Sequence, residues 1–283
     1  MATRTWNGST SGDWSLAANW SAATVPIAGD SVIIPSGTPA ITSFSVGGSQ
    51  NITLAKMTVE KGYLNDIGGS GNPLTVSFSS RLVHRGTGTL WFKDGSSAAT
   101  ALIVINSDNT TNAAQLDCDS TGGSTTKILV RKGKTTIAGT SNTYGEIEVT
   151  YRDSPSTDSV LDISSGSVTV TLLKQNAGTI TSAAAVTTAI LAGGKLTQTG
   201  STVITTAYIV GGYLLANNNG ATTVTTCNLM QGTLDLKGNS LEKTITTLQR
   251  APGSTLMWDA QLHTISNSAT GIVGAFYDYA EES

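Results

Sequence analysis

A short phrase that recurs five times in the second half of the chain constrains the fold most. The copies begin with a β-branched residue and threonine at Val170, Val186, Ile204, Val224 and Ile245. A glycine follows each starting residue after eight positions, at Gly178, Gly194, Gly212, Gly232 and Gly253. Both series advance by 16, 18, 20 and 21 residues, as in a chain that winds around one axis while only its corner loops change length. The phrase therefore predicts a β-solenoid.

Apolar residues lie two apart within each copy, which places them on one face of a strand. The expected inward residues before the glycine are Ala189, Leu191, Ala207, Ile209, Cys227 and Leu229, and those after it are Ile180, Leu196, Leu214 and Leu234. The glycine between the two strands supplies a corner with positive φ, which a β-branched residue resists. The last copy has Arg250 and Thr255 at inward places, which indicates that the stack ends there.

The same template fits upstream at Leu54, Met57, Val59, Gly62 and Leu64. No run of 12 residues shows helical spacing with a capping residue at its start. We therefore expect an all-β fold, a single-stranded parallel β-helix of roughly eleven coils, on the order of 50 Å long. Its expected parts are an N-terminal cap (1–40), a solenoid (41–265) with long irregular loops to about residue 165, and a C-terminal cap or tail (266–283).

Composition agrees with this fold and limits the function. Only 12% of the residues are charged and 31 are glycine, while serine and threonine are abundant, which disfavours helical domains and disorder. The net charge is −3 and the basic residues are scattered, so we expect no nucleic-acid partner. Neither a secretory signal nor an apolar run long enough for a bilayer is present in the sequence. We therefore expect no membrane partner and synthesis in a host cytoplasm without export.

The first 35 residues follow a different pattern, with W-x-G at Trp6, G-x-W at Trp14, N-W at Trp20, then Pro26 and G-D-x-V-x-I around Asp30. This segment resembles the opening of β-helical bacterial surface and autotransporter-passenger proteins and of related phage virion proteins. The resemblance implies β-helix architecture and says little about activity. Physically, three tryptophans with tight turns suit a lid over an open solenoid end, so Trp6, Trp14, Trp20, Pro26 and Asp30 are the expected structural cap. A sugar-stacking platform is the alternative.

Residues that could carry chemistry do not form a catalytic set. His84 and His263 have no metal-ligand spacing, and Gly133-Lys134-Thr135 lacks the earlier glycine of a phosphate loop. The acid pairs Asp117/Asp119 and Glu146/Glu148 point the same way along a strand, but the sequence singles out no partner for them. We predict no catalytic, metal or cofactor-binding residue.

The two cysteines and the C-terminal tail complete the candidates. Cys227 takes an inward place and is expected to be a buried thiol, whereas Cys118, between two aspartates, is expected at the surface. The tail ends in aromatic and acidic residues, so it either caps the final coil, with Trp258, Ile272 and Phe276, or docks on a partner. Phe276, Tyr277 and Tyr279 are the possible docking residues.

Three functions from different classes remain. The first is a non-enzymatic capsid decoration or cement protein on the outside of a phage-type virion, expected as a homotrimer that binds a major capsid protein or another virion protein. The second is a tail-fibre, tailspike or cell-surface adhesin module that binds glycans, located at the bacterial surface. The third is a β-helix polysaccharide lyase or hydrolase. We favour the first, because the chain is of modest length, starts without an export signal and lacks a catalytic set.

Overall fold

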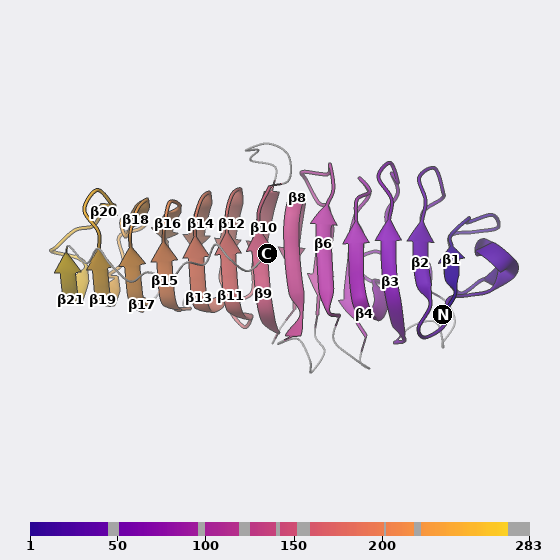
Figure 1. The fold of residues 1–283 in the computed structure, drawn as a ribbon, viewed down its shortest axis with the longest axis horizontal. Coiled ribbons are helices and arrows are strands. Elements are labelled where there is room, and N and C mark those ends of the chain that lie inside the picture. Colours follow the sequence, from indigo (N-terminus) through magenta and orange to yellow (C-terminus); the bar gives the residue numbers. More distant parts are fainter. Residues whose placement is uncertain are drawn as a thin grey trace.

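The chain forms a parallel β-solenoid of about ten turns in a computed structural model (Figure 1). The structure describes residues 1–44, 51–95, 100–118, 125–139, 142–151, 159–200, 202–217 and 222–270. All pairings between the strands of the described ranges are parallel. The only helical turns in these ranges are η1 (Ala17–Asn19) and η2 (Ser21–Ala23). The predicted all-β solenoid with almost no helix is confirmed.

Two parallel sheets face each other across the core. The first sheet contains β1 (Thr3–Thr5), β2 (Ser31–Ile34), β3 (Thr53–Val59), β4 (Leu74–His84), β6 (Leu102–Asn106), β8 (Lys127–Ile137), β9 (Thr143–Val149), β11 (Thr169–Gln175), β13 (Ala185–Leu191), β15 (Ile204–Ile209), β17 (Thr222–Leu229), β19 (Thr244–Arg250) and β21 (Thr264–Thr270). The second contains β5 (Leu90–Asp94), β7 (Ala114–Asp117), β10 (Ser159–Ile163), β12 (Thr179–Ser182), β14 (Lys195–Gln198), β16 (Tyr213–Ala216), β18 (Thr233–Asp235) and β20 (Thr255–Met257). The long strands β4 and β8 bend and contribute to both sheets.

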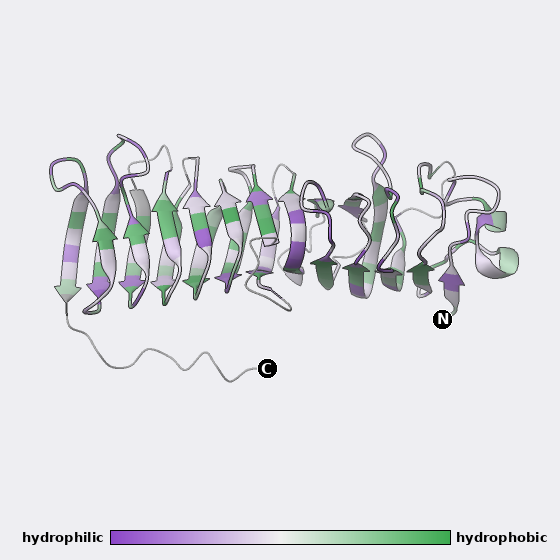
Figure 2. Ribbon diagram, turned by 90° about the horizontal axis from the view of Figure 1, so that it is seen from above, coloured by the Kyte–Doolittle hydropathy of each residue, from purple (hydrophilic) through white to green (hydrophobic). Residues whose placement is uncertain are grey.

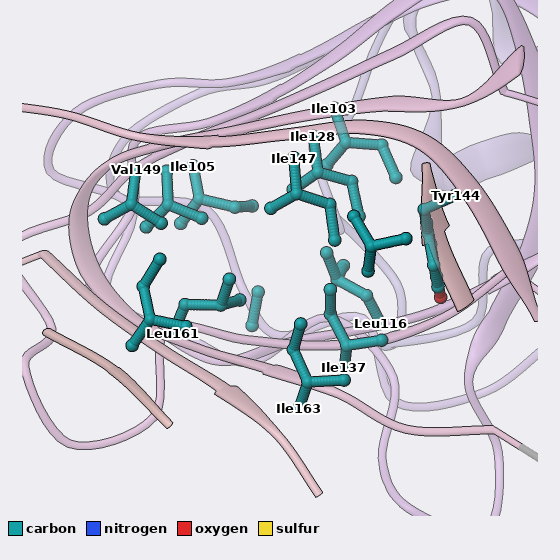
Figure 3. Close-up of a cluster of buried hydrophobic side chains, with 14 of the residues drawn as sticks. Ile103, Ile105, Leu116, Ile128, Ile137, Tyr144, Ile147, Val149, Leu161 and Ile163 are labelled. Atoms are coloured by element: carbon teal, nitrogen blue, oxygen red, sulfur yellow. The ribbon is translucent and has the colours of Figure 1, made fainter. Parts of the chain in front are cut away.

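Columns of similar side chains fill the space between the sheets. In Figure 3, Ile103, Ile128 and Ile147 of successive turns lie one behind another and face Leu116 and Ile137 of the second sheet. Parallel pairing aligns corresponding residues of each turn, so an apolar residue at an inward place meets its counterpart in the next turn. The alternation of hydrophobic and hydrophilic segments along the strands is visible in Figure 2.

The repeated phrase behaves as predicted at its inward places. Ala189, Ala207 and Cys227 form one column, and Leu196, Leu214 and Leu234 form another, all with 0% exposure. Two threonines lie between the first two inward residues of the last four copies, and the second of them forms an outward column of Thr188, Thr206, Thr226 and Thr247. The strand therefore bends at these threonines.

The predicted corner glycines occupy the corners, and five of the six have positive φ. The φ angles of Gly62, Gly178, Gly194, Gly232 and Gly253 lie between 72° and 90°. The expectation of positive φ is wrong for Gly212. That corner needs glycine for space, because a Cβ there would lie 3.1 Å from both the Gly193 carbonyl oxygen and the Leu191 Cβ.

Two predicted inward residues are wrong. Leu64 is 71% exposed, and the neighbouring Tyr63 is fully buried in its place. The Tyr63 hydroxyl donates to the Pro39 carbonyl at 3.1 Å, which satisfies its polar end inside the turn. Thr255 is exposed because the last corner is one residue longer, so that Leu256 pairs with Leu234.

The ladder of the first sheet begins within the segment expected to form the cap. β1 pairs with β2, and β2 pairs with β3. The lid itself is the excursion between β1 and β2, which carries both 3-10 turns. At about 4.8 Å per strand the first sheet spans on the order of 60 Å.

Candidate functional site

The three N-terminal tryptophans form a closed aromatic cluster at one end of the rod. Trp20 packs edge-on against Trp6 and Trp14, with ring centroids 5.1 and 4.6 Å apart. Trp6 Nε1 donates to the Pro39 carbonyl at 3.0 Å, and Trp20 Nε1 donates to the Trp14 carbonyl at 2.7 Å. All three rings are at most 1% exposed. They therefore seal the core and leave no ring face on which a sugar could stack.

Polar residues of the same segment hold the lid in place. Asn19 is fully buried, and its side-chain oxygen accepts hydrogen bonds from the N–H groups of Thr10 and Ser11 at 2.9 and 3.1 Å. Its amide donates to the Asp13 carbonyl at 2.8 Å. The asparagine of the N-W pair thus organises the loop before Trp14, a role that spacing alone did not indicate. Pro26 is also buried.

Asp30 fastens the start of the chain to β2. Its carboxylate accepts hydrogen bonds from Ala2 N–H at 2.8 Å and from Arg4 Nε at 3.0 Å. Burial by itself raises the pKa of Asp30, but these hydrogen bonds and one from the Ile27 N–H outweigh burial and hold the pKa below its ordinary value. Asp30 is therefore a charged anchor for β1.

The pair Glu146 and Glu148 lies on the outer face of the first sheet, on β9. Lys127 of the preceding turn and Lys174 of the following turn lie 3.1 and 3.0 Å from Glu146 Oε1. Burial by itself raises the pKa of Glu146. The hydrogen bonds and charges of the two lysines outweigh burial, so the pKa lies below its ordinary value. Because this carboxyl group is ionised and paired near neutral pH, it is poorly suited to donate a proton.

The other acid pair falls partly outside the described residues, where Asp119 lies. Asp117 Oδ2 is 3.4 Å from Lys93 Nζ, and its Oδ1 accepts a hydrogen bond from Asn142 Nδ2 at 3.3 Å. The pair Asp94 and Thr100 lies on a neighbouring turn, with a hydrogen bond of 2.6 Å between the Thr100 hydroxyl and Asp94 Oδ1. These contacts form a polar corner between the two sheets, in which Asp94, Thr100 and Asn142 are buried.

Cys118 belongs to this corner, so the expectation of a surface thiol is wrong. Its side chain is 1% exposed, and its N–H donates to the Tyr144 hydroxyl at 3.4 Å. Burial and the nearby Asp94 raise the pKa of the Cys118 thiol, so it is protonated and unreactive at neutral pH. The signal was present in the sequence, since Cys118 stands two residues after the inward Leu116. Cys227 is buried as predicted, and both cysteines are free.

The two histidines are far apart in the solenoid. His84 is fully buried in the first sheet, and its Nε2 lies 3.0 Å from the Gly88 carbonyl. His263 is 4% exposed and lies just before β21. Gly133 of the phosphate-loop-like segment lies at the bend of β8 with φ of 92°. Among the described residues no group of three or more histidine, cysteine or acidic side chains could hold a metal ion.

The possible docking residues Phe276, Tyr277 and Tyr279 lie outside the described residues, as does Ile272. Trp258 is described and is 37% exposed at the end of β20, beside Met257 at 40%. In the part of the chain that the structure describes, no helix is long and apolar enough to cross a membrane.

These features define a class, a parallel β-solenoid protein whose N-terminal end is sealed by an aromatic lid. Comparisons with protein-family models, with curated proteins and with solved structures find no match to the chain.

Proposed function

We propose that the protein is a non-enzymatic structural component of a virion, a decoration or cement protein on the outside of a phage-type particle. The observation that carries the proposal is the unbroken inward column of the first sheet from Val32 to Leu248, in which no member is more than 3% exposed. A continuous core between two hydrogen-bonded ladders makes a stiff rod, which suits a load-resisting particle component.

The outer surface of the regular turns supports the same role. The column of Thr188, Thr206, Thr226 and Thr247 presents a neutral, repetitive face to solvent. Such a face can pack on identical neighbours, as in a homotrimer, or on a capsid protein without desolvating charge. The resemblance of the N-terminal segment to β-helical surface and phage virion proteins supports the virion location.

The experiment is quantitative mass spectrometry of intact particles, combined with binding of the purified protein to empty heads. Hundreds of copies per particle and saturable head binding are expected. The variant Thr206→Lys/Thr226→Lys, which places charge on the threonine face, should lose head binding. Thr197→Lys on the outer side of the second sheet is the matched control and should retain it. A few copies at a tail vertex contradict the proposal.

A second candidate, a glycan-binding adhesin module, is favoured by the outer side of the second sheet near its C-terminal end. Lys195 Nζ lies 5.5 Å from the centre of the Tyr213 ring, and the Tyr213 hydroxyl donates to the Asp235 carboxylate. Met257 of the last turn pairs with Asp235, and the partly exposed Trp258 follows it directly, so aromatic and acidic residues occur together at this end of the second sheet. Quenching of tryptophan fluorescence by host glycans, lost in Trp258→Ala, favours this candidate.

The non-enzymatic part of the proposal has its own test. The protein is incubated with acidic polysaccharides, and the viscosity of the polymer is followed. Unchanged viscosity is expected, and a fall in viscosity that disappears in Glu146→Gln contradicts the proposal.

A further inference from the structure

The two ends of the solenoid are built differently. At the N-terminal end the edge strand β1 has three residues, and the lid with Trp6, Trp14 and Trp20 covers the core. At the C-terminal end the edge strand β21 has seven residues and pairs with β19 along its length (Figure 1). Among the described residues β19 is the only strand paired with β21.

The edge strand β21 has none of the features that prevent strand association. Its sequence, Thr-Ile-Ser-Asn-Ser-Ala-Thr, contains no charged residue and no proline. Natural sheets usually protect an edge with lysine, proline, a bulge or a very short strand. Within the described residues, the open side of β21 therefore offers backbone N–H and C=O groups to another strand.

An inward residue of this strand is open to solvent. Ser268 continues the column of Cys227 and Leu248, which are 0% and 3% exposed. Ser268 itself is exposed, and Ile265 of the same strand is only partly buried. The core of the solenoid thus reaches the end of the rod without a described cover.

We propose that this end is a self-association surface on which a second copy of the chain adds its own β21, giving a tail-to-tail dimer with two-fold symmetry. Head-to-tail stacking would require the β1 edge, which the tryptophan lid obstructs. A two-fold interface needs only one surface used twice. Because β21 is neutral, antiparallel pairing with its copy brings no like charges together. The inference is independent of the proposed virion role.

The alternation of side chains suggests the register. Asn267 and Ala269 continue outward columns, whereas Ser268 faces inward. A two-fold axis at Ser268 places Asn267 of one copy opposite Ala269 of the other, with both side chains on the outer face. Directly opposed residues in antiparallel strands have Cα atoms about 4.5 to 5.5 Å apart, which suits a disulfide bond.

The test combines hydrodynamics with cross-linking of the full chain. Sedimentation equilibrium should show a mass twice the 29.0 kDa of one chain, or twice that of the homotrimer where the threonine faces also associate. The variant Ser268→Cys should form a covalent dimer under mild oxidation, since the native Cys118 and Cys227 are buried. N–H groups alternate sides along a strand, and the residue six after each starting residue donates to the preceding turn, as Ala251 does to the Leu229 carbonyl. The Ser268 N–H therefore points to the open edge. Ser268→Pro removes this donor and should halve the mass.

The control for cross-linking is Thr3→Cys, at an exposed position of the edge strand at the sealed end, which should form no covalent dimer on oxidation. Ser268→Cys leaves the strand intact and keeps the test valid if Ser268→Pro disturbs folding. The proposal is overturned if the wild type is a monomer at all concentrations and Ser268→Cys forms no cross-link. This holds whether residues 271–283 or a different protein cover the edge. Equal cross-linking of the Thr3 and Ser268 variants also overturns it.

Discussion

Acid should destabilise the solenoid through His84, which replaces an aliphatic residue in a core column. It lies between Val59 and Ile105 of the adjacent turns and is fully buried. Burial lowers the pKa of His84 from 6.5 to about 4, against smaller opposing contributions that include the hydrogen bond with the Gly88 carbonyl. The neutral ring is therefore the form that fits the fold.

The magnitude follows from linkage between protonation and folding. The pKa of His84 is lower in the folded than in the unfolded state, so its stabilisation is complete above pH 6.5 and is lost as the pH falls toward 4. The full shift from 6.5 to about 4 corresponds to about 3 kcal/mol. At pH 5, about 2 kcal/mol of this is already lost. The lowered pKa values of Asp30, Asp108 and Glu146 keep these carboxyl groups ionised at pH 5.

The assay is the free energy of unfolding by denaturant at pH 8 and pH 5, for the wild type and His84→Gln. Glutamine is a suitable replacement because Gln175 occupies the same inward column and donates from Nε2 to the carbonyl of Gly178 at 3.1 Å. The variant should lose about 2 kcal/mol less than the wild type on acidification. His263→Gln is measured alongside, because His263 is the only other histidine and burial lowers its pKa as well. Equal pH dependence of the wild type and His84→Gln refutes the reasoning.

Four further substitutions test the corners, the lid and the Asp30 anchor by denaturant unfolding. Gly253→Ala meets no atom within 4 Å but retains φ of 86°, so it should cost about 1 to 2 kcal/mol, whereas Gly178→Ala places a Cβ close to the Ser159 carbonyl oxygen and should cost clearly more. Equal costs would contradict the close approach at Gly178. Trp20→Ala should cost about 3 to 5 kcal/mol, and a change below 1 kcal/mol would contradict its place in a packed lid. Asp30→Asn should cost about 1 to 3 kcal/mol and accelerate hydrogen exchange at Ala2 N–H; unchanged exchange there would contradict the anchor.

The regular turns could be predicted from the sequence because local pattern and global fold agree in them. Alternation of period two fixes which residues face inward, and parallel stacking repeats this choice from turn to turn. Ala207 and Leu214 are examples in which spacing alone gave the correct burial. The tryptophan lid was predictable for a related reason, since an open core needs a large apolar cover.

Where the corners change length, the same reasoning failed. Leu64 and Thr255 were misplaced because one residue more or less after a corner exchanges the two faces of the following strand. Cys118 was misplaced because its acidic neighbours suggested a loop, although its distance from Leu116 indicated the inward face. The ion pairs of Glu146 could not be predicted, because they join turns whose spacing depends on intervening loops.

Polar residues inside the regular core distinguish one turn from the next and so help to specify the register of the strands. Purely apolar columns of Ala, Leu and Ile would remain buried if the chain slipped by a whole turn, so they specify the register weakly. Gln175 and Gln198 break this equivalence. Gln175 Nε2 donates to the Lys195 carbonyl of the next turn at 3.0 Å, and Gln198 Nε2 donates to the Ala184 carbonyl at 2.8 Å. A slipped pairing would bury these amides without their acceptors, which is costly, so we infer that the few inward amides help to give the repetitive rod a single register.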